Sequence, residues 1–103
     1  MTNKRWSERG AVKDILDCLP ERMRGGIIRY VEDGVPCGGF LTAVFTNDFY
    51  NAVNRADWAN EHVLPFYGKL LTVMPSVSWG TRQRYNKWIE RGGLNGRGKG
   101  GGQ

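Results

Sequence analysis

The residues best suited to chemistry lie between Gly34 and Asp57, in the stretch GVPCGGFLTAVFTNDFYNAVNRAD. A turn rich in glycine and proline leads into apolar residues at helical spacing, and two charges fall in or beside the apolar face. At about 100° per residue from Leu41, Asp48 lies at about 340° and Arg55 at about 320°. A carboxylate and a guanidinium placed there must pair, bond to backbone or face a ligand. The stretch is therefore a candidate binding site.

The turn before this helix adds a feature that suits anions. Because glycine has no side chain, the N–H groups around Gly38 and Gly39 can point outward and bind phosphate or carboxylate. The turn is not a P-loop, because GxxxxGK[ST] is absent and the next lysine is Lys69. An ordinary tight turn between two helices is the alternative interpretation.

A polar stripe beside the two charges favours a planar ligand. Amides, a guanidinium and an indole can together hydrogen-bond to and stack on a nucleobase. The alternative is that the charges bond other helices and the asparagines are solvated. The stripe consists of Asn47, Asn51, Asn54, Trp58 and, if the helix stays straight, His62.

Each residue of the predicted site has an expected role. Arg55 pairs with phosphate, Asn51 hydrogen-bonds a base or sugar, and Trp58 stacks. Asp48 orients Arg55 or accepts a hydrogen bond from the ligand. The predicted ligand-binding set is Gly38, Gly39, Asp48, Asn51, Arg55 and Trp58.

Catalytic and metal chemistry have weak support in the residue types. His62 is the single histidine, and Cys18 and Cys37 do not form a CxxC pair. Four-ligand zinc spacing is absent. A Cys37–His62 couple and Asp48 or Asp57 as a base are conceivable, but no spacing favours them. We expect no catalysis, cofactor or metal, and reduced thiols, with a single disulfide as the open alternative.

Around the candidate site, the apolar spacing predicts an all-α fold: a compact bundle of four to five short helices. Helices are expected at 11–18, at 20–33, from 38 or 39 to at least 58, at 66–74 and at 82–91, with Pro65 forcing a kink or restart and Thr81 capping the last helix. Residues 11–94 form the predicted single domain. A flexible arm at 1–10, which Trp6 can anchor, and a disordered, glycine-rich tail at 95–103 flank it.

The net charge of +5 lies at the two ends of the 103-residue chain. Residues 11–90 hold nine basic and nine acidic residues, so the expected domain is neutral. Charge alone is thus weak evidence for a DNA-binding domain. The basic tail can make weak contacts with nucleic acid. We expect no membrane span, because no apolar run approaches 18 residues, and no signal peptide.

Aromatic content bears on assembly. Four tryptophans, four tyrosines and four phenylalanines are many for 103 residues. Short chains with many large rings often complete their core across a subunit interface. A homo-oligomer, with a dimer first, is therefore expected.

The segment from Arg29 to Gly93 resembles a family of small uncharacterised proteins of tailed bacteriophages and prophages. The matching pieces are RYVEDGVPCGGFLTAVFTNDF, NRAD, MP, SWG and KWIERGGL. Members commonly read Pro-Pro-Gly where this chain has Pro36-Cys37-Gly38, which argues against a catalytic Cys37. The resemblance implies a phage accessory protein acting in the host cytoplasm.

Together these features lead to one expected function and two alternatives. The first is an anti-defence binding protein that sequesters an anionic, nucleotide-like molecule without catalysis. The second is a nucleic-acid-binding accessory protein that uses its basic termini. The third is an inhibitor of a host defence enzyme that docks through exposed aromatic residues such as Trp79.

Overall fold

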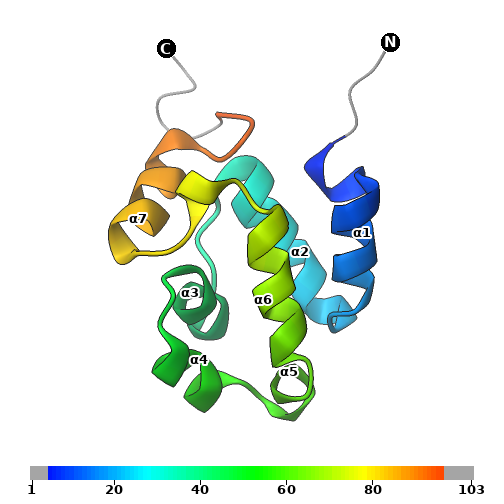
Figure 1. The fold of residues 1–103 in the computed structure, drawn as a ribbon. Coiled ribbons are helices and arrows are strands. Elements are labelled where there is room, and N and C mark those ends of the chain that lie inside the picture. The colour runs from blue at the N-terminus through cyan, green and yellow to red at the C-terminus, as the bar shows by residue number, and fades with distance from the viewer. Residues whose placement is uncertain (1–4, 97–103) are drawn as a thin grey trace.

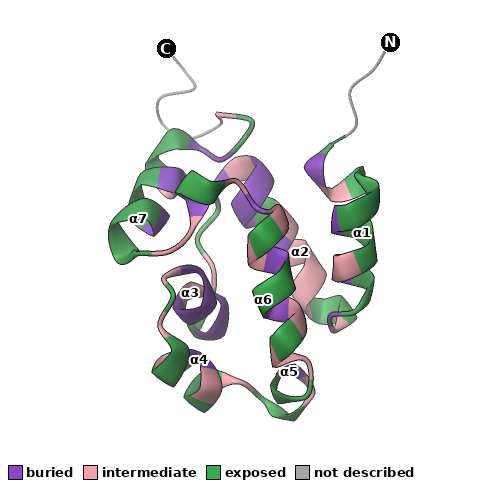
Figure 2. Ribbon diagram, viewed as in Figure 1, coloured by how far each residue is buried: buried purple, intermediate pink, exposed green. Residues whose placement is uncertain are grey.

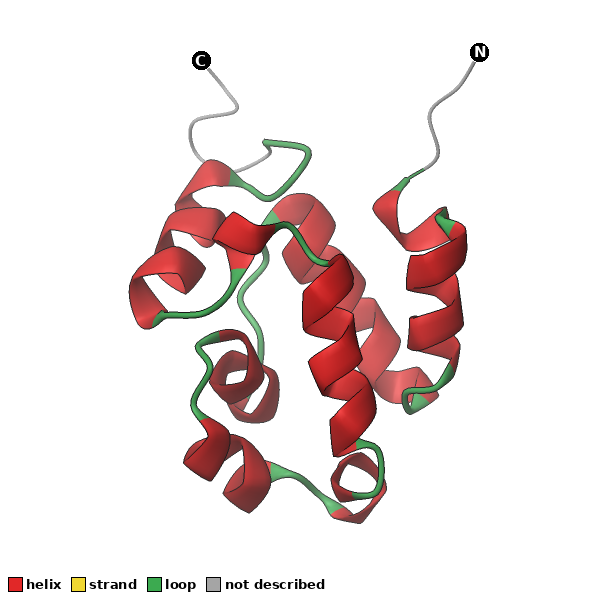
Figure 3. Ribbon diagram, viewed as in Figure 1, coloured by secondary structure: helices red, strands yellow, loops and turns green. Residues whose placement is uncertain are grey.

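The computed structural model describes residues 5–96, and this part of the chain is all-helical, as predicted (Figures 1 and 3). It holds seven α-helices rather than four or five, together with two 3₁₀ turns. The elements are η1 (Trp6–Glu8), α1 (Gly10–Asp17), α2 (Glu21–Asp33), α3 (Gly39–Phe45), α4 (Phe49–Arg55), α5 (Trp58–Glu61), α6 (Leu64–Val73), η2 (Ser76–Ser78) and α7 (Arg82–Arg91).

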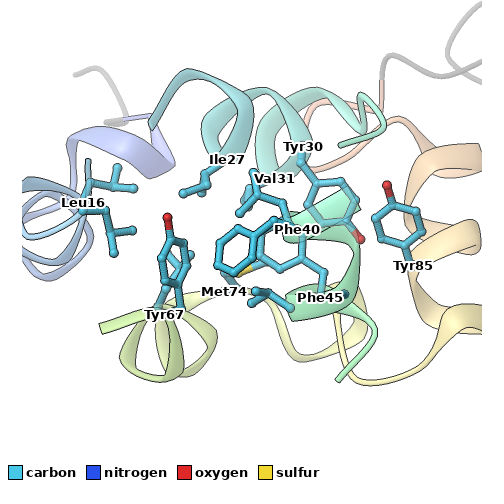
Figure 4. Close-up of a cluster of buried hydrophobic side chains, with 14 of the residues drawn as sticks. Leu16, Ile27, Tyr30, Val31, Phe40, Phe45, Tyr67, Met74 and Tyr85 are labelled. Carbon is cyan, nitrogen blue, oxygen red and sulfur yellow. The ribbon is translucent and has the colours of Figure 1, made fainter. Parts of the chain in front are cut away.

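The core forms where α1, α2, α3, α6 and α7 meet (Figure 4). Tyr30 of α2 is fully buried in it, with its ring stacked on Phe45 at 4.8 Å and on Tyr85 at 5.1 Å. The Tyr30 hydroxyl donates to the carbonyl of Ser78 at 2.6 Å, and burial raises its pKa. Figure 2 colours the buried positions purple, and α3 holds many of them. These contacts fix α7 against α2 and α3.

The prediction of one long central helix that reaches at least residue 58 is wrong. The first helix of this segment, α3, ends at Phe45, because Asn47 adopts a left-handed φ of 61°. The Thr46 hydroxyl donates to the carbonyl of Thr42 at 2.8 Å, and Asp48 then caps a new helix, α4. A second break follows at Ala56, where the backbone is extended. The angles drawn on one straight wheel therefore do not describe this segment.

Other helix boundaries agree with the sequence signals. Gly34 and Gly92 end α2 and α7 in the left-handed conformation, at φ 70° and 85°. The Thr81 side chain accepts from the Arg84 amide at 3.0 Å and caps α7. Pro65 lies in the first turn of α6, so the chain restarts a helix there. These local signals set where the helices begin and end.

Both ends of the described chain attach to the core. Trp6 is buried, and its indole N–H donates to the carbonyl of Val73 at 3.0 Å, so it anchors the start of the chain. The amides of Leu94 and Asn95 donate to the carbonyls of Val31 and Glu32 at 3.0 and 2.8 Å. The remainder of the predicted arm, residues 1–4, and of the tail, residues 97–103, lies outside the described residues.

Two further expectations from the sequence concern the cysteine thiols and a membrane span. Cys18 is exposed and Cys37 half-buried, and both are free thiols. Of the helices in the described range, none has the length and apolar character needed to cross a bilayer.

Candidate functional site

A polar hollow of about 240 Å³ opens between α3, α4 and the start of α7, which lie along one side of the molecule (Figure 1). We call it the α3–α4–α7 hollow. Contacts of α3 with both α4 and α7 hold its walls together. It is lined by Cys37, Gly39, Thr42, Ala43, Thr46, Asp48, Asn51, Arg55 and Arg82.

Arg55 reaches back from the last turn of α4 onto the first residue of α3. A Cβ atom at Gly39 would lie 2.9 Å from Arg55 Nη1 and 3.3 Å from Cδ, so a side chain at this position would displace the Arg55 side chain. Gly38, the N-cap of α3, supplies no side-chain hydrogen bond. The Arg55 guanidinium thus lies beside the first residue of α3 and adds a positive charge to the hollow.

Arg82 approaches the hollow from α7. Its guanidinium carbon lies 5.7 Å from the centre of the Tyr85 ring. Within residues 5–96, the side chains of Arg55 and Arg82 make no hydrogen bond and no salt bridge. Both guanidiniums therefore keep their donors available to a ligand.

Asp48 and Asn51 form the cap of α4 on the hollow's rim. Asp48 accepts from the Asn51 backbone amide at 3.2 Å and from its side-chain amide at 2.7 Å. These bonds lower the pKa of Asp48, and the charges of Arg82 and Arg55 lower it further. The carboxylate is ionised at neutral pH and partly offsets the two arginines.

Two residues that line the hollow, Cys37 and Thr42, contact the buried Tyr85. The Tyr85 hydroxyl accepts from the Cys37 amide at 2.9 Å and lies 3.1 Å from the Thr42 hydroxyl. Thr42 also donates to the carbonyl of Cys37 at 3.1 Å. Burial raises the pKa of the Cys37 thiol to about 12. The thiol is thus protonated at neutral pH and a poor nucleophile.

The structure brings four of the six predicted residues together: Gly39, Asp48, Asn51 and Arg55. Gly38 adjoins the hollow without lining it. Trp58 begins α5 with 75% of its surface exposed, and its ring lies 4.3 Å from that of His62 rather than in the hollow. The break at residues 56–57 separates it from the other members.

Sequence reasoning missed Arg82, Thr42 and Thr46. Arg82 is more than twenty residues from Arg55, and only the packing of α7 on α3 brings it to the hollow. Thr42 and Thr46 are spaced as successive turns of one helix, a pattern that by itself indicates no ligand. Local spacing therefore held no signal for them.

The structure also bears on the Cys37–His62 couple, on metal binding and on docking through Trp79. Cys37 and His62 line no common hollow in the described chain. Among residues 5–96, no three His, Cys, Asp or Glu side chains are placed to hold a metal ion. Trp79 is not an exposed aromatic: it packs against the core, and its indole N–H is buried without an acceptor in the described chain.

Comparison with known proteins assigns no family. No family model matches the chain, and neither a curated protein nor a solved structure matches it. The resemblance to phage proteins thus stays a prediction from the sequence.

Proposed function

We propose that the protein binds a small anionic, nucleotide-like ligand in the α3–α4–α7 hollow and sequesters it without catalysis. The observation that carries this proposal is the pair of Arg55 and Arg82, which line one hollow without a hydrogen bond or salt bridge in residues 5–96. Guanidinium forks match the geometry of phosphate oxygens and bind them in a bidentate manner. A phosphate between the two would neutralise both charges.

The size and lining of the hollow support a small ligand. Its volume of about 240 Å³ lies below the roughly 300–1,000 Å³ of pockets that enclose drug-sized molecules. It suits a phosphate together with part of a sugar or base. The hydroxyls of Thr42 and Thr46 lie in the same lining and can bond further ligand oxygens.

The groups that could perform chemistry in the hollow are already engaged. The Cys37 thiol is held protonated by burial, and the Asp48 carboxylate caps α4. A protein that holds its ligand is therefore the better proposal than one that transforms it. With the phage resemblance, the role we propose is an accessory, anti-defence protein in the host cytoplasm.

Isothermal titration calorimetry with two probes, inorganic pyrophosphate and adenosine 5′-monophosphate, tests this proposal. We expect both to bind the full chain, and Arg82→Gln or Arg55→Gln to weaken binding at least about tenfold, because each removes a charge-assisted hydrogen bond. Arg9→Gln is the matched control, since Arg9 is exposed and lines a different hollow. Thermal melting of each variant shows that it is folded.

Two results would overturn the proposal. One is the absence of heat from either probe at millimolar concentration. The other is unchanged affinity in folded Arg82→Gln and Arg55→Gln. Binding of pyrophosphate alone would support an anion site and reject the nucleotide-like part of the ligand.

A further inference from the structure

The net charge of the chain gathers at its C-terminal end. From residue 82 onward the sequence holds six basic residues and one acidic residue, Glu90, which gives +5. That equals the net charge of the whole protein, because residues 1–81 hold nine basic and nine acidic residues. Residues 82–103 therefore carry a net charge of +5, whereas residues 1–10 carry +2 and residues 11–81 carry −2.

Three of these cations share one face of α7. At about 100° per residue, Arg84, Lys87 and Arg91 fall within about 60° of one another. All three line a shallow hollow of about 280 Å³ whose apolar surface comes from Val77 and Trp88. We call these three residues the α7 basic face.

The two arginines of this face are held in place by the protein. Arg84 Nη1 donates to the carbonyl of Ser76 at 3.3 Å, and the Arg91 guanidinium carbon lies 4.8 Å from the centre of the Trp88 ring. Arg91 Nε also donates to the carbonyl of Gly93 at 3.2 Å. Lys87 is exposed and makes no hydrogen bond or salt bridge within residues 5–96. Within the described residues, no carboxylate forms a salt bridge with Arg84, Lys87 or Arg91.

The α7 basic face is separate from the α3–α4–α7 hollow. Arg82 points about 180° away from Arg91 around the helix axis, with the buried Tyr85 and Trp88 between them on one side. Of the three cations of the face, none lines the α3–α4–α7 hollow. A ligand on one site therefore does not use the cations of the other.

We propose that the α7 basic face binds the phosphate backbone of a nucleic acid. Arg91 lies seven positions after Arg84, so the row runs about 10 Å along the helix. A single small anion cannot reach all three cations, whereas a strand with one phosphate per about 3.4 Å of duplex axis can. The chain continues past residue 96 with Arg97 and Lys99, which extend the positive sequence. Charge complementarity with a polyanion thus selects the partner, and no base-specific contact is implied.

Fluorescence anisotropy with the full chain and a labelled 20-base-pair DNA duplex tests this proposal. Three phosphate contacts predict a slope of about −2.7 for log affinity against log salt, a loss of about 40-fold between 50 and 200 mM NaCl. Lys87→Gln should make the slope shallower by about 0.9 and weaken binding about tenfold at 50 mM. Lys69→Gln, the same change on an exposed residue of α6 outside this hollow, should leave affinity within twofold.

Three outcomes would overturn the proposal. The first is no binding to DNA or to an RNA of equal length at 50 mM NaCl. The second is an equal effect of Lys87→Gln and Lys69→Gln. The third is displacement of DNA by poly-glutamate at equal charge concentration, which would identify an acidic protein surface as the partner instead.

Discussion

At the scale of single residues, Asp48 is the group whose role the structure defines best. It lines the α3–α4–α7 hollow with two arginines, yet its oxygens accept from both amides of Asn51. The sequence suggested that Asp48 orients Arg55 or accepts from the ligand. The geometry favours a cap whose negative charge opposes an incoming anion.

Asp48→Asn is therefore expected to bind phosphate more tightly, by roughly threefold, because it removes a nearby negative charge. Asparagine is also a good N-cap, so α4 is retained. Asp57→Asn is the control for a changed cap: Asp57 caps α5 through the Asn60 amide at 2.9 Å and also pairs with Arg22, and it lies outside the hollow. Calorimetry with pyrophosphate measures both. Weaker binding by Asp48→Asn would show that the carboxylate helps to hold the ligand.

Cys37 gives a prediction that depends on pH. Because burial raises its pKa to about 12, the thiolate is scarce at pH 7.5 and increases about tenfold per pH unit up to that value. Iodoacetamide should label the exposed Cys18 at least ten times faster than Cys37, as read by mass spectrometry. The Cys37 rate should still rise above pH 10. A Cys37 rate that levels off near pH 9 would contradict the raised pKa.

At the scale of elements, the helix ends were predictable and the break in the centre was not. Gly34, Pro65, Thr81 and Gly92 each act within a few residues, and the structure uses each of them as expected. The segment Thr46-Asn47-Asp48 also holds local signals, an asparagine that tolerates positive φ and an aspartate that caps. The helical spacing of apolar residues from Leu41 onward predicts one continuous helix, and this prediction overrode the two local signals.

The candidate site likewise contains residues that could be predicted from the sequence and residues that could not. Gly39, Asp48, Asn51 and Arg55 were found because they are close in sequence, although the straight helix used to group them does not exist. Arg82 required the packing of α7 on α3, which no local pattern encodes. Trp58 was assigned on the assumption that the helix ran on through residue 58.

The close contact between Gly34, after α2, and Gly93, after α7, gives a prediction for stability. A Cβ at Gly34 would lie 2.7 Å from the Gly93 nitrogen, at a φ of 70°. Gly34→Ala should thus lower the free energy of unfolding by about 3 kcal/mol, the sum of left-handed strain and overpacking. Gly96→Ala has similar strain at φ 64°, but its nearest atom is 3.9 Å away, so about 1 kcal/mol is expected. Urea denaturation compares them, and equal losses would rule out the steric contribution.

At the scale of the whole molecule, the large rings divide between core and surface. Trp6 and Trp88 are buried, whereas Phe49 and Trp58 are 79% and 75% exposed. The rings inside pack within one chain, so the described core does not depend on a partner for them.

The homodimer predicted from aromatic content stays a prediction. If it forms, the exposed rings of α4 and α5 are the apolar surface available to it. Sedimentation equilibrium between 1 and 50 µM is expected to give twice the mass of the 11.6 kDa chain. A monomer mass across that range would contradict the prediction.

The central claim is that the α3–α4–α7 hollow, rather than the α7 basic face, holds the small anion. The most direct test is an NMR titration of ¹⁵N-labelled protein with adenosine 5′-monophosphate, followed at backbone amides and arginine Nε–H groups. Saturable shifts are expected at Gly39, Thr42, Arg55 and Arg82. Shifts confined to Arg84, Lys87 and Arg91, or no saturable shift at all, would contradict the claim.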